Sequence, residues 1–188
     1  MLLDEILTFN TSFVENKEYE PYQTERYPNK KLVILSCMDT RLVELLPKAM
    51  NVRNGDVKII KNAGAIISSP YGSVVRSILI SLYELRAEEV MIVGHHNCGM
   101  ANIDPNSIIQ KMQEHGVTEE AFKQVEQEDI NLQKWLTGFD NVEESVKRSV
   151  DKLRTHPLFP KSTPIHGLVI NPSTGKLQLI DNGYEYST

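Results

Sequence analysis

Apolar residues in this chain form two patterns. The first consists of short, mainly apolar runs, and the second of stripes in which apolar residues recur at helical spacing. Because a strand buried on both faces is apolar along most of its length, each run predicts a buried strand. Such runs occupy residues 32–35, 57–60, 89–93 and 165–170. A helically spaced stripe follows each of the first three runs. Strands that alternate with helices predict right-handed crossovers, and therefore an α/β fold of three layers around a central, mostly parallel sheet.

Three details of this pattern give sharper predictions. The stripe at 74–85 is apolar around much of the helix circumference, so we expect that helix to be buried. Asp140, followed three residues later by Glu143, resembles a capping box and predicts where the last long helix starts. The turn at 172–175 leads into a final run at 177–180, which predicts a hairpin at one edge of the sheet.

Two segments lie outside this alternation of strands and helices. Residues 2–19 have the apolar spacing of an amphipathic helix and lead into a polar connector at 20–30 that contains two prolines. Residues 102–139 are acidic and helical in composition. We therefore interpret the chain as a single domain over 1–188, with an N-terminal helical arm at 1–30 and a core at 31–188 that carries a helical insert at about 102–139.

The composition argues against several classes of protein. The chain has 188 residues and a formal charge of −5, so it lacks the basic surface that neutralises nucleic-acid phosphates. It has no apolar run near the roughly 20 residues that span a bilayer, and the acidic Asp4 and Glu5 do not fit a secretory signal. The two cysteines favour a metal site over a disulfide, since nothing else points to an oxidising compartment. We therefore expect a cytoplasmic protein that binds neither nucleic acid nor membrane.

Both cysteines lie just beyond the carboxyl ends of predicted strands. Cys37 follows the run at 32–35, and His95 and Cys98 follow the run at 89–93. The crossover topology makes these strands neighbours, and open α/β sheets bind ligands at the carboxyl ends of their strands. Zinc prefers thiolate and imidazole ligands, and catalytic zinc has three protein ligands and an open fourth position. The sequence therefore predicts one zinc ion per chain, held by Cys37, His95 and Cys98.

Asp39 and Arg41 strengthen the hypothesis of a metalloenzyme. They follow Cys37 by two and four residues, so their side chains can turn back toward the metal. A carboxylate beside a metal is either a further ligand or the acceptor of a hydrogen bond from metal-bound water. Arg41 can hold that carboxylate in bidentate geometry and keep it ionised. We therefore predict that Asp39 and Arg41 are catalytic, with Asp39 as a possible fourth zinc ligand in a closed state.

Each of these residues also has a purely structural interpretation. The cysteines and His95 could be buried core residues, and Asp39 could be an ordinary helix cap. His96 could be a spare ligand, a proton carrier or a side chain that points away. The backbone N–H groups of residues 62–65 could line the same crevice, although this segment matches no phosphate-loop motif. We expect no chemistry from the remaining histidines, His115, His156 and His166.

Together these motifs resemble the signature of the β-class carbonic anhydrases. The shared pattern is C-x-D-x-R at 37–41 followed by G-H-x-x-C-G at 94–99, with Asn-Ala-Gly at 62–64 matching the segment after the second strand. The resemblance extends over about residues 30–182 and includes the segments 141–146 and 167–177. The chain is more similar to the compact prokaryotic branch of the family than to the plant-like branch.

The resemblance implies a zinc lyase that interconverts carbon dioxide and bicarbonate through zinc-bound hydroxide. It implies Cys37, His95 and Cys98 as the zinc ligands and Asp39 and Arg41 as the catalytic pair. Two thiolates donate more charge to zinc than imidazoles would, so we expect activity to rise above neutral pH. The resemblance also implies a homodimer or a dimer-based oligomer, in which the N-terminal arm packs on the partner subunit.

Two other functions are compatible with the same residues. A hydrolase of carbonyl sulfide or carbon disulfide would use the same zinc hydroxide on a different linear triatomic substrate. A non-catalytic zinc-binding interaction module would use the acidic insert as its docking surface. The Asp39–Arg41 pair argues against the second alternative, because a structural zinc site needs no such pair.

Overall fold

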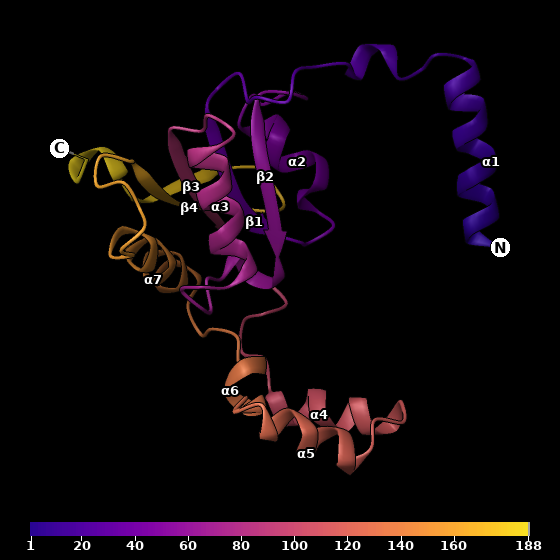
Figure 1. Cartoon of the computed structure of the whole chain (residues 1–188), viewed down its shortest axis with the longest axis vertical. Helices are drawn as coiled ribbons and strands as arrows, with labels where there is room; N and C mark the ends of the chain where they lie inside the picture. Colours follow the sequence, from indigo (N-terminus) through magenta and orange to yellow (C-terminus); the bar gives the residue numbers. More distant parts are fainter. Residues whose placement is uncertain (188) are drawn as a thin grey trace.

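The structure, a computed structural model that describes residues 1–187, is built around one five-stranded sheet (Figure 1). Strands β1 to β4 are parallel, and β5 runs antiparallel to β4 in the order β2-β1-β3-β4-β5. The predicted mostly parallel sheet and its edge hairpin are therefore confirmed. The strands are β1 (Leu32–Cys37), β2 (Val57–Asn62), β3 (Glu89–His95), β4 (Ile165–Ile170) and β5 (Leu177–Asp181).

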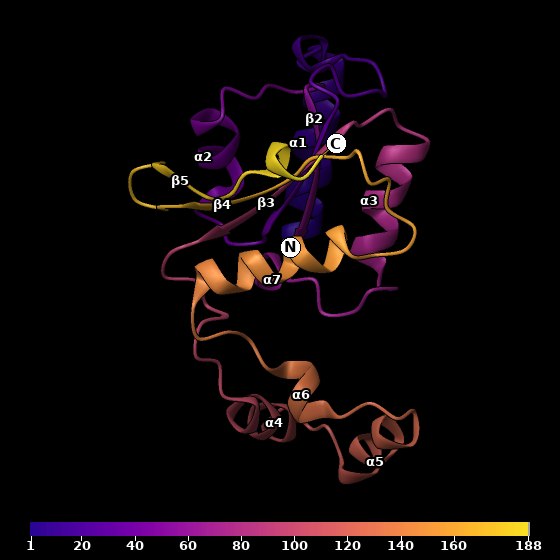
Figure 2. The same cartoon turned by 90° about the vertical axis from the view of Figure 1, so that its left-hand side faces the viewer.

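Helices cover both faces of this sheet and make the predicted three layers. Helices α3 (Ser73–Tyr83) and α7 (Val142–Arg154) pack on one face, and α2 (Leu42–Ala49) packs on the other (Figures 1 and 2). Because successive strand residues point to opposite faces, β1 contributes to both contacts. Val33 faces the α3 and α7 side, whereas Ile34 faces α2. This double burial explains why β1 has a continuous apolar sequence.

Helix α3 is less buried than its sequence predicts. Of its residues only Val75, Ile78 and Ser81 are buried, while Ile80 is 43% exposed and Tyr83 is 66% exposed. The predicted burial holds for one face of α3 only, because the sheet contacts α3 on one side and no other element of residues 1–187 covers its outer face (Figure 1).

Helix α7 starts one residue later than its sequence predicts. Asn141 is the N-cap, and its side chain accepts a hydrogen bond of 2.8 Å from the backbone N–H of Glu144. The predicted capping box at Asp140 and Glu143 is therefore wrong. Phe139, just before this segment, is buried and its backbone is bonded to Met100, so Asn141 is better placed than Asp140 to turn into the helix.

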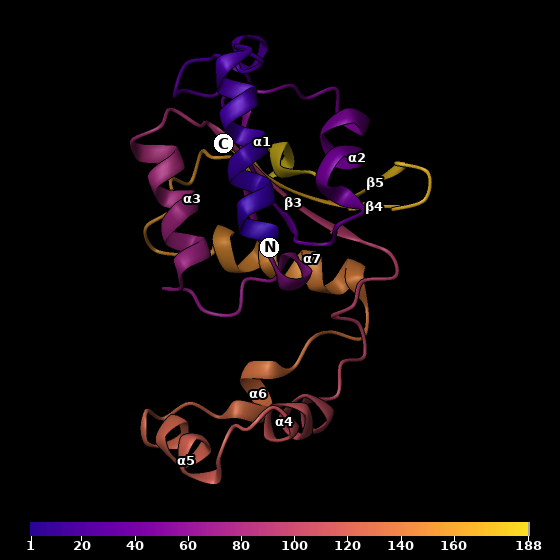
Figure 3. The same ribbon diagram turned by 90° about the vertical axis from the view of Figure 1, so that its right-hand side faces the viewer.

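Two helical segments lie apart from the sheet, one at the N-terminus, as Figure 1 shows, and one at the insert, as all three views show (Figures 1, 2 and 3). The first is α1 (Leu2–Glu15), which ends earlier than the predicted 2–19 and contains no buried residue. The second is the predicted insert, which forms α4 (Pro105–Glu114), α5 (Glu119–Gln127) and α6 (Leu132–Leu136). None of the helices within residues 1–187 has the length and apolar character needed to span a bilayer.

Two strand glycines allow α7 to lie close to the sheet. A Cβ atom at Gly167 would lie 2.8 Å from Val146 Cγ1, and one at Gly94 would lie 2.8 Å from Cγ2 of both Val142 and Val146. Real Cβ atoms essentially never approach a neighbour that closely. The contact between α7 and the strands that lead to the carboxyl edge of the sheet therefore depends on these two glycines.

We expect Gly167→Ala to lower the free energy of unfolding by about 1–3 kcal/mol, because the new methyl group would overpack the α7 interface. Urea denaturation measures this change. The matched control is Gly99→Ala, since no atom lies within 4 Å of the Cβ position there and its backbone conformation suits alanine. Equal stability of the two variants would contradict the close packing of α7.

Candidate metal centre

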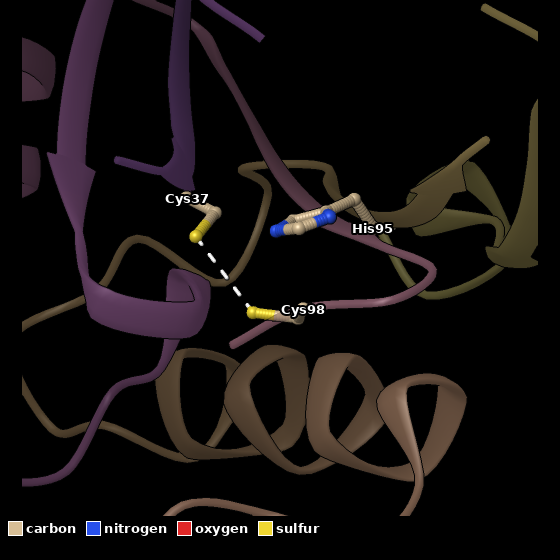
Figure 4. Close-up of side chains that lie close together, drawn as sticks. All are labelled: Cys37, His95 and Cys98. Atoms are coloured by element: carbon tan, nitrogen blue, oxygen red, sulfur yellow. Dashed lines mark hydrogen bonds between the residues drawn. The ribbon is translucent and has the colours of Figure 1, made fainter. Parts of the chain in front are cut away.

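The parallel pairing of β1 with β3 brings the predicted ligands to one edge of the sheet. The register runs from Leu32 opposite Glu89 to Ser36 opposite Val93. Cys37 and His95 are the last residues of these neighbouring strands, and Cys98 lies in the turn that follows β3. Figure 4 shows the three side chains directed toward a common point.

The distances among these side chains fit a single metal ion. Their three donor atoms lie within 4.8 Å of one another, and the two sulfurs are 3.8 Å apart. Two sulfurs bound to one zinc ion at about 2.3 Å with tetrahedral angles would be separated by about 3.8 Å. Cys37, His95 and Cys98 are 4%, 1% and 7% exposed. The geometry and chemistry of the donor set therefore suit zinc without rearrangement.

His95 is oriented to present one ring nitrogen to this point. Its Nδ1 lies 2.9 Å from the carbonyl oxygen of His96, and an Nδ1–H that donates to this oxygen leaves a lone pair on Nε2. Nε2 is buried and has no hydrogen-bond partner among the described residues. A buried nitrogen with a free lone pair is costly unless it binds a donor or a cation. This orphaned atom is the clearest sign that the site is shaped for a metal.

The two thiols are coupled through their close contact. The hydrogen bond with Cys98 lowers the pKa of Cys37, with further help from the Gly64 N–H, while this contact and burial raise the pKa of Cys98. This coupling opposes the ionisation of both thiols at once. A divalent cation would stabilise both as thiolates, because metal binding displaces thiol protons.

Asp39 lies beside the donor set and is held by Arg41. The Arg41 Nε–H donates to Asp39 Oδ1 at 2.9 Å, its Nη2–H donates to Oδ2 at 2.8 Å, and its backbone N–H donates to Oδ1 at 2.9 Å. These bonds, the side-chain ones first, hold the pKa of Asp39 well below its usual range. Asp39 Oδ2 is 3.7 Å from His95 Nε2. The predicted bidentate pair is present, with an ionised carboxylate next to the common point.

Two backbone features of the site were not predicted from the sequence. The Arg41 Nη2–H also donates to the carbonyl oxygen of Asn97 at 2.9 Å, so Arg41 joins the loops after β1 and β3. Asn97 has a φ of 54°, a left-handed conformation that asparagine tolerates better than most residues. An asparagine before Cys98 in a tight turn is the signal that could have suggested this conformation.

The segment after β2 contributes backbone groups, as the sequence analysis allowed. The Gly64 N–H donates to Cys37 Sγ at 3.3 Å, and Gly64 has a φ of 78° that favours glycine. The Met100 N–H similarly donates to Cys98 Sγ at 3.5 Å. Each sulfur therefore accepts one backbone N–H, which supports negative charge on both.

The remaining histidines do not join the candidate site. His96 contributes its backbone, since its N–H donates to Ile170 and its carbonyl accepts from His95. His115 is exposed, whereas His156 and His166 are buried. His156 bonds the carbonyl of Pro70 at 2.9 Å, and His166 accepts from the Gly183 N–H at 3.0 Å. These hydrogen bonds lie away from the donor set, and the expectation that the three histidines carry no chemistry stays a prediction.

Comparison with known proteins gives a consistent answer. The family model described as carbonic anhydrase matches residues 32–177. YtiB of Bacillus subtilis, which is provisionally named a carbonic anhydrase, is 56% identical over 183 residues, or 97% of this chain and 98% of the relative. The crystal structure of β-carbonic anhydrase isoform I from Trichomonas vaginalis has a TM-score of 0.89 and 36% identity, and the match covers 98% of this chain and 100% of that chain.

A more distant relative has a different activity in its name. A carbon disulfide hydrolase of Acidithiobacillus thiooxidans is 28% identical over 158 residues, which are 80% of this chain and 77% of the relative. The family match covers most of the chain and includes every residue of the candidate metal centre. The chain therefore belongs to the β-carbonic anhydrase family.

Proposed function

We propose that this protein is a zinc-dependent carbonic anhydrase that interconverts carbon dioxide and bicarbonate. The observation that carries the proposal is the ionised Asp39 carboxylate, held by Arg41 beside a donor set of only three residues. A structural zinc site is closed by four protein ligands, and it has no use for an oriented carboxylate beside them. This arrangement favours an enzyme over a non-catalytic zinc-binding module.

In the proposed mechanism, Cys37, His95 and Cys98 would hold one zinc ion per chain. When bound, zinc would acidify a water molecule and so provide the nucleophile for carbon dioxide. Asp39 would accept a hydrogen bond from that water and so direct the lone pair of the water oxygen toward the substrate carbon. Arg41 fixes the orientation of the carboxylate through two parallel N–H donors. The Asn97 carbonyl holds Arg41 in place from the opposite loop.

Asp39 is also the proposed fourth ligand of a closed, inactive state. Its Oδ2 lies 3.7 Å from His95 Nε2, so a small rotation would bring it into the donor set. That rotation would break the bonds to the Arg41 side chain. Arg41 therefore favours the open state, in which Asp39 is free to contact water.

Hydrolysis of carbon disulfide or carbonyl sulfide is the second candidate. It is supported by the relative from Acidithiobacillus thiooxidans that is named a carbon disulfide hydrolase. All three substrates are linear triatomics that an activated water can attack at carbon. Stopped-flow rates for carbon dioxide and carbon disulfide on one zinc-loaded sample would separate the two activities.

We further propose that the protein is a cytoplasmic homodimer in which each N-terminal arm packs on the partner. Most apolar side chains of α1 are exposed within the described chain, and Leu2, Leu7 and Phe9 are 71%, 57% and 67% exposed. A second copy that buried this stripe would remove that apolar surface from water. A reducing cytoplasm would keep Cys37 and Cys98 as free thiolates for the metal.

We expect Asp39→Asn to lower the rate of carbon dioxide hydration by about 10²-fold or more while zinc content is unchanged. The amide keeps the shape of the carboxylate but loses its charge. Because the pKa of Asp39 is far below neutrality, the carboxylate is already ionised at pH 7. The loss should therefore be equal at pH 7 and pH 8.5, and activity should still rise between them. Stopped-flow assays on Asp39→Asn and on the exposed control Asp140→Asn test this, and a loss confined to one pH would contradict it.

We expect Cys98→Ser to reduce bound zinc from about one ion per chain to well below one, because a serine hydroxyl is a much weaker zinc ligand than a thiolate. Metal analysis after dialysis measures the content. His96→Ala is the matched control and should keep its zinc, since the His96 backbone alone contacts the site. Zinc loss in the control instead would identify His96 as a ligand.

We expect the double variant Ile6→Asp and Phe9→Asp to convert the dimer into a monomer of 21.4 kDa. Two carboxylates on the apolar face of α1 would make its burial against a partner unfavourable. Light scattering coupled to size-exclusion chromatography measures the mass. Thr8→Asp, on the opposite side of the same helix, should remain dimeric. A wild-type monomer or a dimeric double variant would refute the proposed role of the arm.

A further inference from the structure

The insert at 102–139 is an ordered unit that is tied to the core by a narrow neck. At the neck, the Asn102 N–H donates to Phe139 at 2.9 Å and the Phe139 N–H donates to Met100 at 3.1 Å. Within the insert, a side-chain hydrogen bond of 2.6 Å joins Gln133 of α6 to Asn106 of α4. The helices extend away from the sheet, as all three views show (Figures 1, 2 and 3). The insert therefore presents its surface to other molecules.

The insert carries an open groove with both apolar and polar lining between its own helices. None of the residues in α4, α5 and α6 is buried in the described chain. These helices border an open groove of about 480 Å³, lined by the apolar Ile109, Phe122, Ile130 and Leu132 together with polar and acidic side chains. Ile130 is 40% exposed, so the groove offers apolar surface that a partner could cover.

The rim of this groove is acidic. Glu119, Glu126 and Asp129 line it, and the insert as a whole has seven acidic and three basic residues. Its net charge of −4 accounts for most of the −5 of the whole chain. An occupant must therefore combine apolar side chains for the floor with basic side chains for the rim.

The uncovered helices of this protein itself do not meet that requirement. Helix α1 is apolar and exposed, but it carries Asp4, Glu5 and Glu15 and no basic residue. A second insert would bring another −4 against the first. Like charges at close range oppose both contacts. We propose that the groove of the insert binds a basic amphipathic helix of another protein, seated with its apolar stripe on Phe122 and Ile130.

The single tryptophan of the chain provides a direct probe of this groove. Trp135 lies in α6, three residues beyond the groove residue Leu132, and its side chain is 66% exposed. Exposed tryptophans are frequent in binding hot spots. Because the chain has no other tryptophan, its fluorescence reports on the insert alone.

The test is a fluorescence titration of the full-length, zinc-loaded protein with a synthetic amphipathic helix of leucine and lysine. We expect saturable binding of one peptide per chain that weakens with added salt. The double variant Glu126→Lys and Asp129→Lys should bind about tenfold more weakly, a loss of about 1.4 kcal/mol. The double variant Glu84→Lys and Glu88→Lys makes the same charge change on the exposed core surface and should bind like wild type.

Three results would overturn the proposal. Equal weakening in both double variants would mean that net charge alone attracts the peptide. Equal binding of a peptide with glutamate in place of lysine would mean that the acidic rim has no role. In the protein without peptide, Trp135 could be protected from iodide quenching and lose this protection on dilution to monomer. That result would show that a second copy already covers the groove.

The titration does not measure carbon dioxide hydration. Its failure would therefore leave the proposed activity standing, and a loss of activity would leave the proposed docking surface standing.

Discussion

The parallel pairing of β1 with β3 is the constraint on which the candidate site depends. Cys37 and His95 are 58 positions apart in sequence, yet each ends one of these adjacent strands. The ladder between them places the two strand ends at the same edge of the sheet. Because the strands are buried on both faces, their register is held by the apolar core on each side. The turn after β3 then needs only three residues to bring Cys98 to the same point.

Electrostatics organise the site around this framework. Two buried thiols cannot both ionise without a nearby positive charge, and the backbone N–H donors of Gly64 and Met100 supply part of it. A zinc ion would supply the rest. Arg41 has a separate task, since it keeps Asp39 ionised and spans the gap between the two ligand-bearing loops. The three donor residues that could hold a metal are thus distinct from the Asp39–Arg41 pair, which is placed to contact water and substrate.

The molecule combines this rigid core with two acidic helical projections. The core buries its apolar residues between the sheet and its helices, whereas helix α1 and the insert helices α4, α5 and α6 contain no buried residue. A helix with an amphipathic sequence and no partner in its own chain is stable only to a limited degree. Both projections are compatible with the proposed association of the arm with a second copy and of the insert with a basic partner.

The sequence by itself determined the strands, the sheet class and the identity of the candidate site residues. A continuous apolar run is a local signal that can be read from the sequence. Each of the two site motifs follows such a run, which is why the sequence identifies Cys37, Asp39, Arg41, His95 and Cys98. Only the tertiary structure decided that α3 is half exposed, that Asn141 caps α7, and that the Asn97 carbonyl holds Arg41. The physical reason is that a sequence pattern reports which face of an element is apolar, whereas burial and long-range hydrogen bonds depend on which distant residues meet that face.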